Sequence, residues 1–73
     1  MNILHMRYAV EIADTKSLNK AAGNLYVGQP NLSRAIKDLE NDLGITIFDR
    51  SHKGMTLTPN GETFIKYAKS VLK

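Results

Sequence analysis

Residues 29–44 constrain the fold of this chain more than any other segment, because they combine an apolar stripe at helical spacing with a first-turn proline and a C-terminal glycine. The apolar residues of the segment recur at helical spacing, at Leu32, Ile36, Leu39 and Leu43. Pro30 suits a first helical turn, where its missing amide has no intrahelical partner, and Gly44 suits a left-handed C-terminal cap. A helix with one apolar stripe must bury that stripe, so the remaining chain must supply a core around it.

Two shorter helices are predicted before this segment. The first is expected to end near residues 14–15, and its apolar stripe consists of Met6, Ala9, Val10 and Ala13. Ser17 is a good N-cap for the second, whose stripe is Leu18, Ala21, Ala22 and Leu25. The small alanine side chains would let another helix approach closely.

The hydrophobic period changes after Gly44. Alternation at residues 45–47 and again at 55–58 predicts two short strands around a loop that contains Gly54. Thr58 followed by Pro59 predicts the N-cap and first position of a fourth helix. The order helix, helix, short turn, helix, hairpin, helix predicts a mostly α fold, the winged helix-turn-helix, with a three-helix core and a two-stranded wing.

Length and composition exclude several classes of protein. With 73 residues we expect one domain, and with no cysteine there is neither a disulfide nor a thiolate metal site. No apolar run approaches the roughly 20 residues that span a bilayer, so we expect a cytoplasmic chain without a membrane partner. The histidines, His5 and His52, have no ligand set or triad spacing around them. We therefore expect no metal, no cofactor and no enzymatic activity.

Charge is distributed in zones along the chain. The net charge of +3 divides into about −1 over residues 1–14, +4 over 15–37, −4 over 38–49 and +4 over 50–73. Two basic zones therefore flank an acidic one. A basic zone at the start of the third helix and another at the hairpin favour a polyanionic partner such as double-stranded DNA.

Polar side chains that fit base or phosphate contacts cluster at the start of the third helix. They fall off the apolar stripe within about two turns, at Gln29, Asn31, Ser33, Arg34 and Lys37. Amides can pair with adenine, Arg34 with guanine, Ser33 with base or phosphate, and Lys37 with the DNA backbone. Local capping by the amides, or a surface ion pair between Arg34 and Asp38, would also account for single members of the cluster.

The hairpin tip and the fourth helix carry the other candidate contacts. Arg50, His52 and Lys53 would form a basic wing, although a soluble turn has the same composition. The fourth helix has an apolar stripe that could pack on a partner, at Phe64, Ile65, Ala68, Val71 and Leu72. A protein-contact module with an incidental basic surface is therefore an alternative to a DNA-binding domain. Salt distinguishes the two, because DNA binding weakens steeply as salt rises.

The chain resembles, over nearly all of its length, the N-terminal DNA-binding domain of LysR-type transcriptional regulators. The residues that carry the resemblance are Ser17, Leu18, Ala21, Ala22, Leu25, Val27, Gln29, Pro30, Leu32, Ser33, Ile36, Leu39, Glu40, Leu43, Gly44, Phe48, Arg50, Leu57, Thr58 and Gly61. One departure is Gly28, where the family usually has a capping serine.

The resemblance implies a bacterial transcription regulator that binds an inverted repeat as a homodimer. Gln29, Pro30, Ser33 and Arg34 match base-reading or backbone-contacting positions, and Arg50 and Lys53 match the wing. We expect Ser17 to help position the phosphates. Residues 1–58 would be the DNA-binding domain and residues 59–73 the start of a linker helix for dimerisation. The effector-binding domain of the family, which senses a small molecule, is absent, as in an expressed fragment or a shortened protein.

Overall fold

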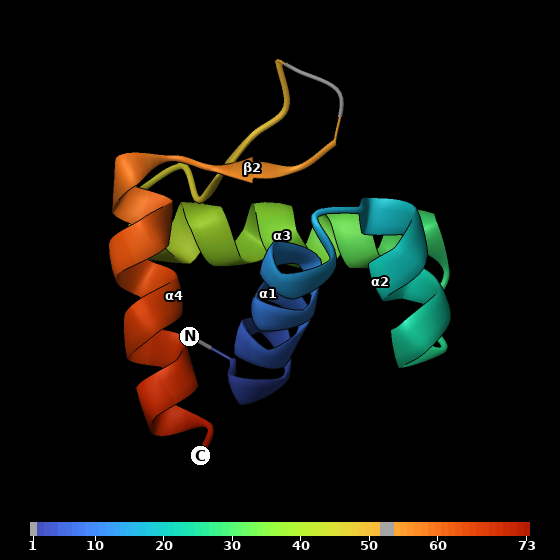
Figure 1. Ribbon diagram of the computed structural model, residues 1–73, viewed down its shortest axis with the longest axis horizontal. Coiled ribbons are helices and arrows are strands. Elements are labelled where there is room, and N and C mark those ends of the chain that lie inside the picture. The colour runs from blue at the N-terminus through green and yellow to red at the C-terminus, as the bar shows by residue number, and fades with distance from the viewer. Residues whose placement is uncertain (1, 52–53) are drawn as a thin grey trace.

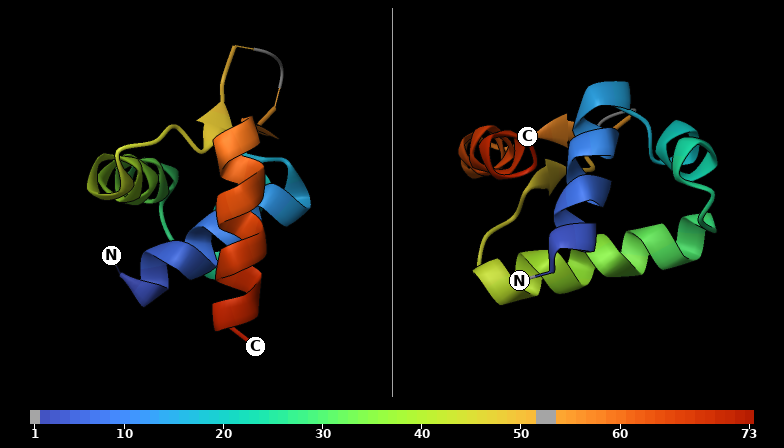
Figure 2. Two further views of the ribbon diagram at one scale, coloured as in Figure 1. Left: turned by 90° about the vertical axis from the view of Figure 1, so that its left-hand side faces the viewer. Right: turned by 90° about the horizontal axis from the view of Figure 1, so that it is seen from below.

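A computed structural model gives the structure of residues 2–51 and 54–73. Along these residues the elements are α1 (Ile3–Thr15), α2 (Leu18–Leu25), α3 (Gln29–Leu43), β1 (Phe48–Asp49), β2 (Thr56–Leu57) and α4 (Pro59–Val71). Figure 1 shows α3 crossing behind α1, with α4 on one side of α1 and α2 on the other, and the β1–β2 hairpin at the top. The view from below in Figure 2 shows the same arrangement, with α4 and α2 on opposite sides of α1. The predicted winged helix-turn-helix is confirmed.

The core lies where the apolar stripes of the helices meet. Helix α1 contacts each of the other three helices and buries Met6, Ala9 and Ile12. The predicted stripe of α3 forms the centre of this core, with Leu32, Ile36 and Leu39 fully buried and Leu43 partly buried. Burial of these side chains is the main favourable term for folding, at roughly 1.5–3 kcal/mol for each large aliphatic residue.

Local capping fixes where the helices begin. The side chain of Ser17 accepts a hydrogen bond from the backbone N–H of Lys20 at 3.0 Å, and that of Thr58 accepts from Gly61 at 2.9 Å, as the sequence predicted. Gly44 ends α3 in the left-handed region at φ 69°, with its N–H donating to the carbonyl of Glu40. These caps satisfy backbone groups that have no partner within the helix, and so set the lengths of the helices.

Helix α3 begins without a side-chain cap, and this gives a first prediction. Gly28 occupies the N-cap position with φ −65° and ψ 140°, and a Cβ built there has its nearest contact at 3.8 Å. We expect Gly28→Ser to add a cap and to reduce the freedom of the unfolded chain, raising stability by about 0.5 kcal/mol. Circular dichroism should show a melting temperature about 2–4 °C higher. An unchanged or lower melting temperature would contradict this account of the α3 N-terminus.

The wing is a two-stranded antiparallel sheet in which Phe48 pairs with Leu57 and Asp49 with Thr56. The sequence pattern placed the first strand at residues 45–47, but pairing begins only at Phe48. The reason is that the N–H of Ile47 donates to the Glu40 carboxylate and not to the opposite strand, although its carbonyl still accepts from the N–H of Thr58, which stands opposite Ile47 in the register. Residues 45–47 therefore connect α3 to the wing and do not form a strand.

Candidate nucleic-acid interface

A groove of about 390 Å³ lies between the start of α2, the start of α3 and the wing. We call it the α2–α3–wing groove, and its lining residues are Ser17, Leu18, Asn19, Gln29, Ser33, Arg50, Gly54 and Met55. The groove brings together four residues that the sequence predicted as DNA contacts and that lie up to 33 positions apart, as the numbers of Ser17 and Arg50 show. The fold therefore gathers side chains from three elements on one surface.

A helix cap and a backbone hydrogen bond build this groove. Ser17 caps α2 and thereby starts the helix at the groove edge. On the wing side, the N–H of Met55 donates to the carbonyl of Lys16 at 3.2 Å, so the chain returning from the wing is held against the turn between α1 and α2. Because Met55 is buried while Arg50 is exposed, the wing offers an apolar base and a charged outer side chain.

A smaller notch of about 290 Å³ adjoins the groove and is lined by Leu18, Gln29, Pro30 and Ser33. It combines one amide, one hydroxyl and two apolar side chains. A side-chain amide can donate to and accept from a base edge, whereas apolar groups contact a thymine methyl group. Pro30 thus lies beside two of the predicted readout residues, Gln29 and Ser33.

Three other predicted residues of α3 do not line the groove. Successive helical residues are turned by about 100°, so Asn31 lies about 160° from Ser33, on the other side of the helix. Its side chain accepts a hydrogen bond from the Nη1 of Arg34 at 3.4 Å, so Arg34 is directed toward an amide and not toward Asp38. Lys37 follows Ser33 by about one turn and is exposed on the same side, farther from the helix start.

Several residues that line the groove were not predicted as contacts from the sequence. They are Leu18, Asn19, Gly54 and Met55. Asn19 had a usable signal, because it is a polar residue two positions after the predicted cap Ser17 and lies in the basic zone. The predicted wing contacts His52 and Lys53 lie outside the described residues.

The electrostatic character of the groove suits an anion. Among its described lining residues, Arg50 carries the one charge and no acidic side chain is present. The hydroxyl of Ser33 and the amides of Asn19 and Gln29 can donate hydrogen bonds to phosphate or to base edges. A nucleic acid could therefore approach without meeting a carboxylate.

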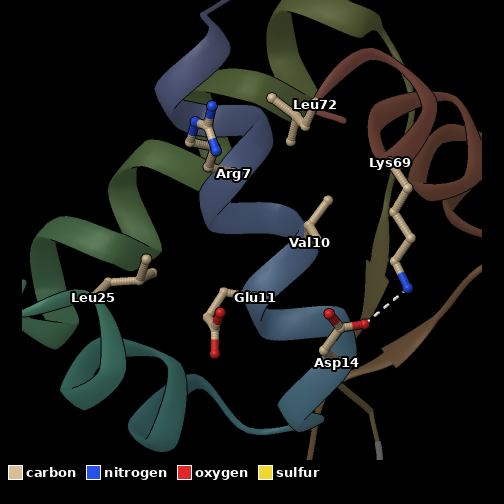
Figure 3. Close-up of a pocket in the computed structure, with 7 residues that line it drawn as sticks. All are labelled: Arg7, Val10, Glu11, Asp14, Leu25, Lys69 and Leu72. Carbon is tan, nitrogen blue, oxygen red and sulfur yellow. Dashed lines mark hydrogen bonds and ion pairs between the residues drawn. The ribbon is translucent and has the colours of Figure 1, made fainter.

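A second groove, of about 470 Å³, lies on the other side of α1 and has a different character. We call it the α1–α4 groove, and its lining residues are Arg7, Val10, Glu11, Asp14, Leu25, Lys69 and Leu72 (Figure 3). Figure 3 shows Lys69 reaching across from α4 to Asp14, with an Nζ to Oδ1 distance of 2.9 Å. Glu11 accepts a hydrogen bond from the side chain of Asn24 at 2.9 Å. Two carboxylates make this groove a poor match for phosphate.

Most side chains of the predicted dimerisation stripe pack within this chain. Phe64, Ile65 and Ala68 are buried in the core of this chain, and Leu72 is partly buried against it, so these four side chains do not form an exposed face for a second copy. Val71 remains exposed, at 45%. The stripe was assigned to a partner because its period identifies an apolar face but does not say what covers that face.

No helix in residues 2–51 and 54–73 is long and apolar enough to cross a membrane. Over the same residues, no group of three or more histidine, cysteine, aspartate or glutamate side chains is placed to hold a metal ion.

Comparison with known families gives one match over most of the chain. Residues 3–62 match the family described as bacterial regulatory helix-turn-helix protein, lysR family. The uncharacterised HTH-type transcriptional regulator YcgK of Bacillus subtilis is 49% identical over 73 residues, which is all of this chain and 22% of that protein. The regulator BenM of Acinetobacter baylyi is 40% identical over 72 residues, 99% of this chain and 24% of BenM. The chain thus spans about a quarter of the length of these curated relatives.

Solved structures of similar chains include complexes with DNA. The BenM DNA-binding domain in complex with benA site 1 DNA has a TM-score of 0.95 and 40% identity, covering 99% of this chain and 81% of that one. The CbnR DNA-binding domain in complex with DNA has a TM-score of 0.94 and 35% identity, covering 99% and 83%.

Proposed function

Because the chain belongs to the lysR family of bacterial regulatory helix-turn-helix proteins, we propose that it binds duplex DNA sequence-specifically and regulates transcription in the bacterial cytoplasm. One observation carries the proposal: the α2–α3–wing groove gathers Ser17, Gln29, Ser33 and Arg50 at the start of α3 without an acidic neighbour among its described lining residues. The printed descriptions of two similar structures, the BenM and CbnR domains, are of complexes with DNA, which supports the same assignment.

In this proposal α3 enters the major groove with its first two turns toward the base edges. Gln29 pairs with a base through its amide, Ser33 reaches a base or a phosphate, and Pro30 supplies apolar contact beside them. Arg50 in the wing and Ser17 at the start of α2 contact phosphates on either side. Arg34, exposed on α3, pairs with a guanine, and Lys37, also exposed on α3, contacts the DNA backbone.

We propose further that two copies bind together through the exposed apolar side chains of α1 and α4. Tyr67 and Val71 are 53% and 45% exposed on α4, and Ile3 and Leu4 are 52% and 50% exposed on α1. Four partly exposed side chains offer little apolar area, so we expect a weak dimer that forms mainly on DNA. Two copies bound in this way would place their α3 helices about one helical turn of DNA apart.

Sedimentation tests the dimer proposal. The free chain is expected to sediment as a monomer at low micromolar concentration, and as two copies per duplex when a two-half-site DNA is added. Val71→Asp should abolish the second copy, because a charge in the contact would have to be desolvated. Ser70→Asp, on the same helix at an exposed position outside the apolar set, is the matched control. A tight dimer without DNA would contradict this prediction.

Selection from a randomised pool of duplexes tests the DNA-binding proposal. At about 150 mM salt, where purely electrostatic binding is already weakened, we expect enrichment of an inverted repeat with half-sites about one helical turn apart. Binding without enrichment would mean phosphate contact without base readout. No retained DNA would contradict the proposal and favour a protein-contact module, whose binding would respond little to salt.

A further inference from the structure

Glu40 of α3 is buried although its side chain is a carboxylate. Only 8% of its surface is exposed, and it is the one buried polar or charged residue among those described. Its Oε2 accepts hydrogen bonds from the backbone N–H groups of Ile47 and Phe48, at 2.8 and 3.2 Å. Hydrogen bonds to a charged acceptor are worth more than neutral ones, and they offset part of the cost of burying the carboxylate.

The same residue also organises the end of α3. The carbonyl of Glu40 accepts from the N–H of Gly44 at 2.8 Å and from that of Ile45 at 3.3 Å. Backbone and side chain of one residue therefore hold four backbone N–H donors of the connection, at Gly44, Ile45, Ile47 and Phe48. The path of the chain from α3 to β1 is fixed by Glu40.

This path ends in the proposed DNA contact of the wing. Phe48 and Asp49 form β1, and Arg50 follows directly and lines the α2–α3–wing groove with Gln29 and Ser33. Glu40 lies on the same rigid helix as Gln29 and Ser33. A displacement of residues 47–48 would therefore move Arg50 relative to the base-reading residues while leaving the helix itself intact.

We propose that Glu40 is a positioning residue that sets the place of Arg50 in the wing relative to the start of α3, and that it acts on DNA binding through Arg50. The proposal rests on the proposed function as a DNA-binding domain. An apolar side chain would fill the same space without the cost of a buried charge. A carboxylate adds two directional hydrogen bonds, which hold the N–H groups of Ile47 and Phe48 in place.

The test uses side chains that differ in reach and in charge. Glu40→Asp keeps the charge but is shorter by one methylene, so its oxygens fall short of Ile47 and Phe48. Glu40→Gln keeps the length and one oxygen that can accept from both groups. We expect Glu40→Asp to weaken binding to the selected duplex about tenfold, like Arg50→Ala, and Glu40→Gln to bind within about twofold of wild type. Asp42→Glu, at an exposed position of the same helix, is the matched control and should bind like wild type.

A double-mutant cycle separates positioning from stability. If Glu40 acts through Arg50, the Glu40→Asp/Arg50→Ala protein binds as well as Arg50→Ala alone, and both single variants lose about one ion from the salt dependence of binding. Additive losses of about a hundredfold would overturn the proposal. A Glu40→Asp protein that is unfolded at the assay temperature, or that binds with the wild-type salt slope, would assign Glu40 to stability alone. Failure of the wild-type chain to bind any duplex would overturn the proposed function instead.

Discussion

Replacing Gly61 by alanine is expected to remove most of the stability of this domain. A Cβ at Gly61 would lie 2.0 Å from the carbonyl oxygen of Ile47 and 2.8 Å from its carbonyl carbon. No real contact is that short, and the atoms in the way are backbone, which cannot rotate aside as a side chain can. Overpacking a core by one methylene commonly costs about 1–3 kcal/mol, and here we expect at least about 3 kcal/mol because the obstacle is rigid.

Ile47 cannot retreat from the added methyl group without losing other contacts. Its N–H donates to Glu40, and its carbonyl accepts from the N–H and the hydroxyl of Thr58 at 3.0 and 3.3 Å. Its side chain is fully buried. A shift of the connection at residues 45–47 would break these hydrogen bonds and open a cavity, and a shift of α4 would uncover Phe64. Every route of relaxation is therefore costly.

Urea unfolding followed by circular dichroism measures the effect. The control is the same substitution at Gly23, which is exposed inside α2 and has nothing within 4 Å of a built Cβ. Gly23→Ala should stabilise the domain by about 0.5–1 kcal/mol, because alanine favours the helix. The two substitutions are thus expected to change the stability of the domain in opposite directions. A Gly61→Ala midpoint close to that of wild type would show that α4 does not pack directly on the backbone at Ile47.

The helices could be predicted because their signals are local. Ser17, Pro30, Gly44 and Thr58 each mark a boundary through their own backbone preferences or through a hydrogen bond to a residue a few positions away. The stripe of α3 is likewise a property of the segment itself. For this reason the element order and the winged helix-turn-helix followed from the sequence, whereas the groove shared by Ser17, Gln29 and Ser33 is visible only in the structure.

Features that depend on distant partners could not be predicted in this way. Glu40 is buried because residues 47 and 48 fold back over it, and no hydrophobic periodicity in the sequence predicts that contact. The stripe at Phe64 and Ala68 was equally visible in the sequence, but whether the same chain or a second copy covers it is a matter of tertiary packing. Gly61 was among the residues that carried the family resemblance. The physical reason for a glycine there, the close approach of the Ile47 backbone, is visible only in the structure.

The second large effect is expected in DNA recognition, where Arg34→Ala should change specificity and Arg50→Ala should change affinity alone. A guanidinium bidentate to guanine is worth about 1–3 kcal/mol of discrimination, so loss of Arg34 should weaken the selected duplex about 5–150-fold and relax the preference at one base pair. Loss of a phosphate contact at Arg50 should weaken selected and random duplexes alike and lower the salt slope by about one.

Fluorescence anisotropy with selected and random duplexes over a range of salt concentrations distinguishes the two roles. Arg7→Ala removes the same charge from the α1–α4 groove and should change neither specificity nor the salt slope, because two carboxylates share that groove. The division of labour depends on the positions of the two arginines: Arg34 is carried on the helix that enters the major groove, whereas Arg50 follows β1 in the wing. Equal losses on both duplexes for both variants would mean that neither arginine reads a base, and would leave Gln29 and Ser33 as the readout residues.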